Sequence, residues 1–227
     1  ELELKLSQYV DPYSRLDAII AFNDNIEEQN VDIEEAYYTR WGLPFGFTGQ
    51  IGKFRSKFGK QNLLHLHTLD TVDYPLIIQD FFGDEGLASS GVRLQNMIPN
   101  PWDIPLEITG EVLRGNNGNS FSGISRSPIF NTHLKSFFEI NKEMNLELGT
   151  SAMFGDENAN LSSRGGDRFG VHVLGADATF FWYLPEGKVL KFQNEIMLQA
   201  RDSLIHPNNN PWGFYSLVDY RFSPRWS

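Results

Sequence analysis

The chain contains no cysteine among its 227 residues, which excludes disulfide bonds and cysteine-ligated metal sites. It also lacks any apolar run of the roughly 18 residues that a membrane-spanning helix needs. Basic residues are scarce, because 19 Lys and Arg stand against 29 Asp and Glu, for a net charge of -10. Without a basic stripe, nucleic acid is not expected among the partners.

The motifs of common enzymes are missing as well. The sequence has no Gly-x-Ser-x-Gly, no phosphate-binding loop and no His-Glu-x-x-His, and His133 has no neighbouring motif that suggests catalysis. We therefore expect that the protein is not an enzyme.

What the chain does have is an alternation of apolar and polar residues with a period of two, which predicts β-strands. Between residues 188 and 201, for example, Phe192, Ile196 and Leu198 alternate with Gln193 and Glu195. The pattern predicts eleven strands, at 1–9, 14–23, 31–42, 45–58, 88–98, 104–114, 129–140, 144–154, 168–184, 188–202 and 212–222. Several exceed the usual soluble strand of about 5–6 residues and reach the 9–11 or so that cross a bilayer.

The two faces of the predicted strands differ in charge. In the segment 14–23, Leu16 and Ile20 share one face, whereas Arg15 and Asp17 share the other. The apolar faces carry almost no charge, and the polar faces carry both signs at mid-strand. In a membrane barrel the apolar faces meet lipid, whereas in a soluble sandwich they form the core. Strand length favours the barrel.

Short turns alternate with long loops along the chain, which is typical of a transmembrane barrel. The short turns lie at 10–13, 43–45, 100–103, 141–143 and 185–188, and the long loops at 23–30, 59–86, 115–128, 155–167 and 203–211. Aromatic residues flank the short turns, as in the aromatic girdle at a membrane interface. They are Tyr9, Tyr13, Trp41, Phe45, Trp102, Trp182, Tyr183, Phe222 and Trp226.

We therefore predict an all-β fold, a single antiparallel transmembrane β-barrel domain over residues 1–227 with eleven to twelve strands. Single-chain bacterial barrels usually have an even number of strands. The odd number predicted here indicates either that one strand is missed or split, or that the chain is part of a barrel of about twelve to sixteen strands.

Two segments depart from the regular pattern. In 45–58 the apolar residues change phase between Ile51 and Phe54, which predicts a β-bulge. The connection 59–86 is long and rich in Leu, Ile and Phe, so it is not expected to extend freely into water. We expect it to fold inward as a constriction or plug, or to pack over the barrel mouth, with a short helix.

Several short stretches resemble a family of Gram-negative outer-membrane porin-like β-barrels. They are Glu34-Glu-Ala-Tyr-Tyr38, Gly52-Lys-Phe54, Phe58-Gly59, Leu64-His-Leu-His67, Asp73-Tyr-Pro-Leu76, Phe82-Gly-Asp-Glu-Gly86, Leu146-Glu-Leu-Gly-Thr-Ser151 and Gly175-Ala-Asp177. Some members of that family carry the automatic name zinc-regulated TonB-dependent outer membrane receptor. The resemblance implies a barrel in the bacterial outer membrane with a role in transport, and it names no substrate.

The charged residues of the polar faces are the main candidate functional residues. Facing rows of opposite charge set ion preference in a pore, although they also pair with one another in a closed lumen. The predicted pore-lining residues are Lys5, Arg15, Asp17, Lys53, Arg55, Arg93, Glu107, Glu111, Lys135, Glu139, Glu147, Asp177, Lys191, Glu195 and Arg201.

A second candidate is a metal site at His65 and His67. Histidines two apart in an extended segment face the same side and are able to share a zinc ion, and Asp70 and Asp73 lie close in sequence. The alternative is that both histidines make hydrogen bonds inside a packed loop. Apart from this zinc, no cofactor is expected.

Together these features predict a porin-like outer-membrane channel for passive diffusion of small polar solutes or ions. The alternative is a closed barrel that serves as a structural or partner-binding component of an envelope complex. The expected partners are outer-membrane lipid or lipopolysaccharide, the diffusing solutes, and proteins of such a complex.

Overall fold

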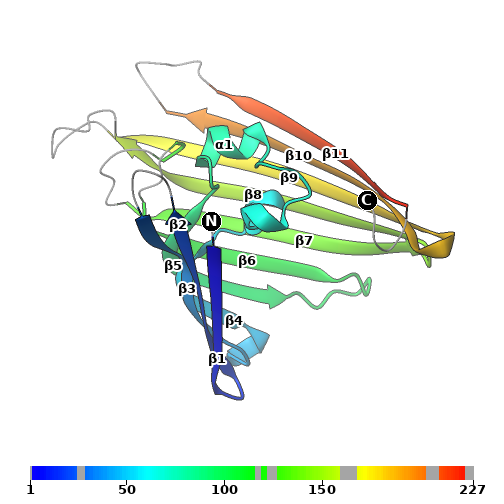
Figure 1. The fold of residues 1–227 in the computed structure, drawn as a ribbon, viewed down its shortest axis with the longest axis horizontal. Helices are drawn as coiled ribbons and strands as arrows, with labels where there is room; N and C mark the ends of the chain where they lie inside the picture. Colours follow the sequence, from blue (N-terminus) through cyan, green and yellow to red (C-terminus); the bar gives the residue numbers. More distant parts are fainter. Residues whose placement is uncertain are drawn as a thin grey trace.

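The chain forms a single antiparallel sheet of eleven strands, which pair in chain order from β1 to β11 (Figure 1). The computed structural model describes residues 2–24, 29–115, 119–121, 127–158, 168–202 and 210–222. The strands are β1 Leu2–Asp11, β2 Ser14–Asp24, β3 Gln29–Arg40, β4 Thr48–Arg55, β5 Ala88–Met97, β6 Leu106–Leu113, β7 Ile129–Asn141, β8 Met144–Asn158, β9 Arg168–Leu184, β10 Lys188–Arg201 and β11 Trp212–Arg221.

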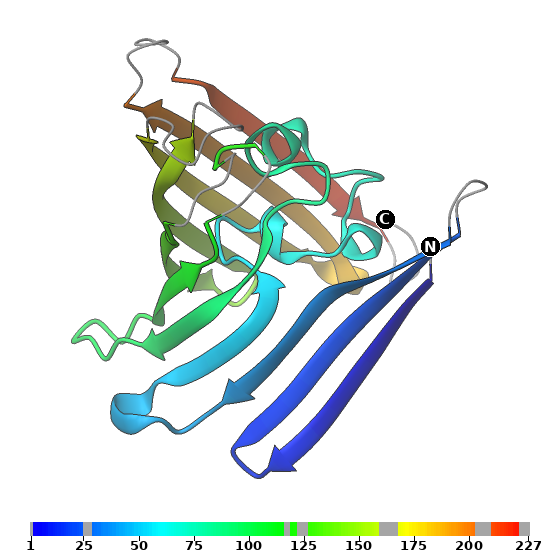
Figure 2. The same cartoon turned by 90° about the vertical axis from the view of Figure 1, so that its left-hand side faces the viewer.

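The sheet is strongly curled but is not closed. Figure 2 shows it as a trough with β1 along one edge and β11 along the other. No ladder joins these two strands in the described part of the chain. The structure thus contains the predicted antiparallel β-sheet without the closure of a barrel. No helix of the described residues is long and apolar enough to cross a membrane.

Period-two alternation places apolar side chains on the convex face and polar ones on the concave face. In β10, Phe192, Ile196 and Leu198 are exposed, whereas Gln193 and Glu195 are buried. A soluble sheet protein shows the opposite arrangement, because its apolar face forms the core. The concave face is therefore the protected interior of this molecule.

The segment between β4 and β5 fills part of the trough. This inserted segment, residues 56–87, contains two short 3-10 helices, η2 Gln61–Leu63 and η3 Leu66–Thr68, and one α-helix, α1 Leu76–Phe82. Figures 1 and 2 both show it on the concave side of the sheet. Two further single-turn 3-10 helices, η1 Pro44–Gly46 and η4 Pro185–Gly187, form the short turns after β3 and β9.

The hydrophobic core lies between the inserted segment and the inner face of the sheet. The Phe58 and Phe82 rings meet edge to face with centroids 5.1 Å apart. Helix α1 buries Ile78, Phe81 and Phe82, and the inner face contributes buried residues of β6 to β10, namely Leu113, Ile129, Met153, Val171, Val173 and Met197. The apolar composition of 59–86 is thus explained by burial inside the trough.

The predicted strands match the observed ones to within four residues at each end, except around β4. Residues 45–58 do not form one strand, because Pro44–Gly46 is a 3-10 turn and the strand ends at Arg55, where the chain enters the trough. The predicted bulge in this segment is also wrong, since β4 pairs with β5 without a register shift. The apolar phase changes there because Ile51 faces outward, whereas Phe54 belongs to the core.

A register shift occurs in β3 instead. The pairs Ile19–Glu35 and Ile20–Ile33 are consecutive, so Glu34 is an extra residue in that strand. An extra residue in a ladder places two successive side chains on one side of the strand. This explains why charged residues occur in both alternating sets of 31–42, with Asp32, Glu34 and Arg40 in one set and Glu35 in the other.

Two sets of predictions concern residues partly outside those described. Strand β8 continues to Asn158, into the predicted loop 155–167. Parts of the predicted loops 23–30, 115–128, 155–167 and 203–211, together with Trp226 of the predicted girdle, lie outside the described residues. Tyr9 and Trp41 of the girdle lie together beside the turns after β1 and β3, with ring centroids 6.3 Å apart.

Candidate functional site

The candidate site is the polar interface between the start of the inserted segment and the concave face. Ser56 Oγ donates to Glu111 Oε2 at 2.5 Å, and the Lys57 backbone N–H donates to Glu111 Oε1 at 3.0 Å. Lys57 Nζ then reaches Glu107 at 2.8 Å and Gln95 at 3.0 Å. Ser56 and Lys57 thus connect the inserted segment to β5 and β6 by hydrogen bonds.

The next residues of the segment contact the opposite half of the trough. The Gly59 N–H donates to Ser151 Oγ at 2.9 Å. Lys60 Nζ lies 2.9 Å from Glu147 Oε1 and 3.1 Å from Thr179 Oγ1. Since these partners belong to β8 and β9, residues 56–60 bridge much of the inner wall in five consecutive positions.

Gln61 extends this bridge to the last two strands. Its backbone N–H donates to Glu195 Oε2 at 3.3 Å, and its side-chain Nε2 donates to Tyr215 Oη at 3.1 Å. Gly59 makes this approach possible, because its φ is +60° and a Cβ there would lie 1.7 Å from Glu195 Oε1. A left-handed φ without a side chain is the conformation that glycine favours.

Asn62 closes the base of the inserted segment. Its Nδ2 donates to the carbonyl groups of Ser56 and Leu87, at 2.8 and 3.1 Å, and its Oδ1 accepts from Leu87 N–H at 2.6 Å. The Ser56 N–H also donates to Leu87 O at 2.9 Å. A fully buried Asn therefore joins the point where the segment leaves the sheet to the point where it returns.

A buried ion pair supports this interface from the sheet. Arg93 Nε lies 2.6 Å from Glu111 Oε1, and the two side chains are 7% and 0% exposed. The Arg93 guanidinium also stacks 4.2 Å from the Phe54 ring centroid and donates to Arg55 O and Gln50. Charge-assisted bonds of this kind compensate for the loss of solvation only when every partner is in place.

The second candidate, around His65 and His67, lies farther along the inserted segment, between η2 and the end of η3. His65 Nδ1 is 2.8 Å from Glu34 Oε2, and its Nε2 is 3.6 Å from Glu35 Oε2. His67 Nδ1 is 2.9 Å from Glu3 Oε1. The neighbouring Glu35 carboxylate raises the pKa of His65 above its usual value, and desolvation opposes this effect.

The predicted geometry of the two histidines differs from the observed one. Leu66–Thr68 is a 3-10 helix rather than an extended segment, and the two rings lie 5.8 Å apart between centroids. The group of potential ligand atoms that lie within 4.8 Å of one another comprises Glu3, Glu34 and His65. Asp70 does not join it, because its carboxylate pairs with Lys191.

Tyr74, a buried residue of the inserted segment, lies in the hydrophobic core. Its hydroxyl donates to Leu64 O, and the Arg55 guanidinium lies 5.6 Å above its ring. Burial raises the pKa of Tyr74 to about 12, so the hydroxyl stays protonated as a donor. This contact joins η2 to the start of α1 inside the segment.

The structure distributes the predicted pore-lining residues over several environments. Asp17, Arg55, Arg93, Glu111, Asp177 and Glu195 are buried. Arg15 pairs with Asp17, Lys53 with Asp32, Lys135 with Glu147, and Arg201 with Glu157. Glu107, Glu147 and Lys191 bind residues of the inserted segment, whereas Lys5 and Glu139 are exposed.

Sequence reasoning missed the residues that bind these charges. Lys57, Lys60 and Asn62 carry no periodic signal, and Lys57 was assigned to a strand that ends at Arg55. Asn131, which donates to Ser56 Oγ and Glu111 Oε2, looked like any polar strand residue. These residues lie far in sequence from the partners that they contact, so no local pattern indicates the contacts.

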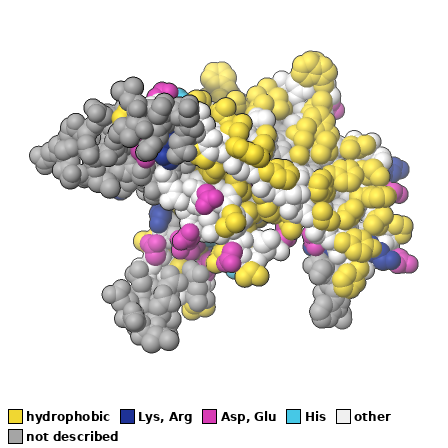
Figure 3. Space-filling model, turned by 90° about the horizontal axis from the view of Figure 1, so that it is seen from above, with side chains coloured by type: hydrophobic (Ala, Val, Ile, Leu, Met, Phe, Trp, Pro, Cys, Tyr) yellow, Lys and Arg dark blue, Asp and Glu magenta, His cyan; other side chains and the backbone are white. Residues whose placement is uncertain are grey.

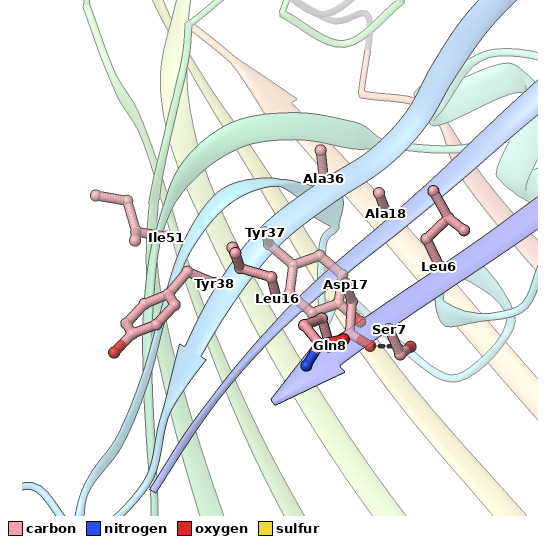
Figure 4. Close-up of a pocket in the computed structure, with 10 residues that line it drawn as sticks. All are labelled: Leu6, Ser7, Gln8, Leu16, Asp17, Ala18, Ala36, Tyr37, Tyr38 and Ile51. Atoms are coloured by element: carbon pink, nitrogen blue, oxygen red, sulfur yellow. Dashed lines mark hydrogen bonds between the residues drawn. The ribbon is translucent and has the colours of Figure 1, made fainter. Parts of the chain in front are cut away.

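A hollow of about 520 Å³ lies among strands β1 to β4 (Figure 4). Leu6, Leu16 and Ile51 line it and belong to the outward face. Its one buried carboxylate, Asp17, accepts from Ser7 Oγ at 2.6 Å, which Figure 4 shows as a dashed line. Since Arg15 also binds this carboxylate, the hollow presents mainly an apolar surface.

Comparison with known proteins finds a relative of the whole chain. A curated protein of Aquifex aeolicus (strain VF5), described as an uncharacterized protein, is 31% identical over an alignment 252 residues long. The alignment covers 99% of this chain and 51% of that protein, so the chain spans about half the length of the curated relative. No protein-family model matches the chain. No solved structure matches it either.

Proposed function

We propose that this chain forms part of the wall of a bacterial outer-membrane β-barrel, which acts as a porin-like channel for passive diffusion of small polar solutes or ions. The observation that carries the proposal is the inverted distribution of side chains across the sheet. In the described residues the outward face exposes large apolar side chains, whereas the inward face buries polar and charged ones. Lipid on one side and a polar interior on the other account for this arrangement.

The apolar outward face extends along nearly every strand. Figure 3 shows hydrophobic side chains over much of the described surface. The exposed outward residues include Leu4, Leu16, Ile51, Val92, Leu94, Val112, Phe130, Leu134, Leu148, Phe154, Leu174, Phe192, Ile196, Leu198, Phe214 and Val218. No second sheet or helix among the described residues covers them, so a two-layer soluble sandwich leaves this surface unexplained.

Strand length supports the membrane assignment. Strands β7 to β10 have 13, 15, 17 and 14 residues, and tilted strands cross a bilayer in about 9–11. The exposed Tyr9, Tyr13, Phe45, Trp102 and Tyr183 beside the short turns fit an aromatic girdle at one membrane interface.

A sheet edge within lipid leaves backbone groups without hydrogen bonds, so a spanning sheet has to close. Strands β1 and β11 are the edges here. We propose that further strands complete the barrel between them, in a wall of about twelve to sixteen strands or more. The relative of about twice this length is consistent with additional strands.

The inserted segment narrows the proposed pore. Its basic residues Lys57 and Lys60 face acidic residues of the inner wall, so charges of both signs lie where solutes pass. The same pairing supports the alternative function, a closed barrel in an envelope complex, because Lys57, Lys60 and Arg93 are all neutralised by direct ion pairs.

Single-channel recording in planar bilayers tests the proposal. Folded protein, verified by heat-modifiable gel migration, is expected to produce stepwise currents, and Lys60→Gln is expected to shift the selectivity toward cations. Lys142→Gln, at the exposed turn between β7 and β8, is the matched control and should leave the selectivity unchanged. Folded protein without current above background rejects the channel and favours the closed barrel. Release of the protein from membranes by washing alone rejects the membrane location.

A further inference from the structure

A cluster of metal-ligating side chains joins the inserted segment to the β1 side of the sheet. Carboxylate oxygens of Glu3 and Glu34 and a ring nitrogen of His65 all lie within 4.8 Å of one another. We propose that these three side chains bind one divalent transition-metal ion of the zinc class. This proposal goes beyond the channel function and does not depend on it.

The three ligands come from three separate parts of the fold. Glu3 belongs to β1, Glu34 to β3, and His65 to the inserted segment between η2 and η3. The register shift in β3 makes Glu34 available, because this extra residue turns inward next to Glu35. Without that shift, regular alternation would place Glu34 and Glu35 on opposite faces.

The surroundings of His65 suit a cation. Glu34 Oε2 is 2.8 Å from Nδ1 and Glu35 Oε2 is 3.6 Å from Nε2, so carboxylates lie at both ring nitrogens. Glu35 Oε1 accepts from the Arg55 backbone N–H at 2.8 Å, which holds Glu35 in position. Glu35 is therefore placed as a supporting acceptor, of the kind that commonly orients a ligating histidine.

His67 supports the third ligand. Its Nδ1 lies 2.9 Å from Glu3 Oε1, and its side chain is 58% exposed, against 19% for Glu3 and 13% for both His65 and Glu34. The proposed site is thus shielded by protein but open on the His67 side. A water molecule or the His67 ring is able to complete a four-coordinate ion from that side.

The chemical types of the three proposed ligands favour zinc over magnesium and calcium. One imidazole nitrogen with two carboxylate oxygens is a set that zinc accepts at about 2.0–2.2 Å, whereas magnesium and calcium prefer oxygen ligands alone. Ligand atoms around a tetrahedral ion at those distances are about 3.3 Å apart. Rotation of the Glu3 and Glu34 side chains, without movement of the strands, is expected to bring the ligands together.

The test is calorimetric titration of tag-free, folded protein with zinc chloride. Wild-type protein is expected to bind about one zinc ion. His65→Ala and Glu34→Gln are each expected to weaken binding by at least about tenfold, because even the loss of a group that only orients a ligand costs about 10–100-fold in affinity. His172→Ala is the matched control, because His172 lies on β9 beside Asp202 and is not one of the proposed ligands. This variant should bind zinc as the wild type does.

X-ray absorption of the zinc-loaded protein identifies the atoms bound to zinc. A folding defect in a variant does not affect this measurement on the wild type. One imidazole, or two where the His67 ring completes the ion, and a remainder of oxygen ligands are expected around zinc in the wild type. Absence of zinc binding by the folded wild type overturns the proposal. So does unchanged binding by His65→Ala, or a first shell without imidazole. A negative result leaves the conductance experiment unaffected, so the two proposals fail independently.

Discussion

Gly59 lies directly against the carboxylate of Glu195. A Cβ at position 59 would be 1.7 Å from Glu195 Oε1, and the Gly59 φ of +60° is one that other residues adopt with strain. The two residues are 136 positions apart in sequence, yet this contact determines how closely the inserted segment approaches β10. No side chain at position 59 fits between the inserted segment and β10 unless Glu195 moves.

Gly59→Ala should destabilise the protein by about 2–4 kcal/mol, because it adds backbone strain and forces the buried Glu195 side chain to move. Equilibrium unfolding in urea, in micelles or vesicles, measures the change. Gly110→Ala is the control, since a Cβ there meets no atom within 4 Å and its effect should stay within about 0.5 kcal/mol. Equal stabilities of the two variants would contradict the observed packing.

Arg93 and Glu111 form a buried pair whose members depend on each other. Arg93→Met should cost about 3–5 kcal/mol, because it leaves Glu111 charged and desolvated. The double variant Arg93→Met with Glu111→Gln should lose less than the sum of the two single losses. Chemical denaturation of all four proteins gives the coupling energy.

The exposed pair Lys188–Glu186, at 2.7 Å against 2.6 Å for Arg93–Glu111, is the control for that cycle. Lys188→Met should change stability by about 0–1 kcal/mol, because water screens exposed pairs. Strictly additive losses at Arg93 and Glu111 would show that the two side chains do not interact.

Asn62→Ala should loosen the base of the inserted segment. The substitution removes three hydrogen bonds and leaves the buried carbonyl of Ser56 and the N–H of Leu87 with fewer partners, at a cost of about 2–4 kcal/mol. Limited proteolysis should then cut within 56–87 faster than in the wild type. Asn96→Ala, which removes an exposed bond to Phe45, should leave the proteolysis rate unchanged.

Ile196→Lys distinguishes a lipid-facing position from a water-facing one. Ile196 lies near the middle of β10 with its side chain outward. If this face meets the bilayer core, the lysine should cost about 2–4 kcal/mol in vesicles. Val72→Lys, at an 89% exposed position of the inserted segment, should be nearly neutral. A neutral Ile196→Lys would indicate that the convex face meets water.

The sequence was informative wherever structure depends on near neighbours. The period of two in 188–201 predicted β10 within one residue, since alternation of side chains follows from strand geometry itself. The turn at Pro185–Gly187 made β9 and β10 adjacent, because a short connection joins antiparallel neighbours. The apolar composition of 59–86 likewise indicated that this connection is covered rather than free in water.

The sequence did not reveal which polar groups meet. Lys60 and Glu147 are 87 positions apart, and nothing local to either residue indicates the other. Their contact depends on the curl of the sheet and on where the chain leaves β4. The same holds for Glu3, Glu34 and His65, which approach one another only because β3 gains one residue and η3 interrupts an extended path.

The sequence by itself thus determined the strands apart from the bounds of β4, their antiparallel order and the separation of an apolar face from a charged one. All three follow from chain geometry over a few residues. Only the tertiary structure decided that the charged face is bound by the inserted segment and that, among the described residues, no ladder joins the edges β1 and β11. Those features depend on contacts between residues that are distant in sequence. Such contacts form through the packing of the whole sheet and not through the local conformational preference of one segment.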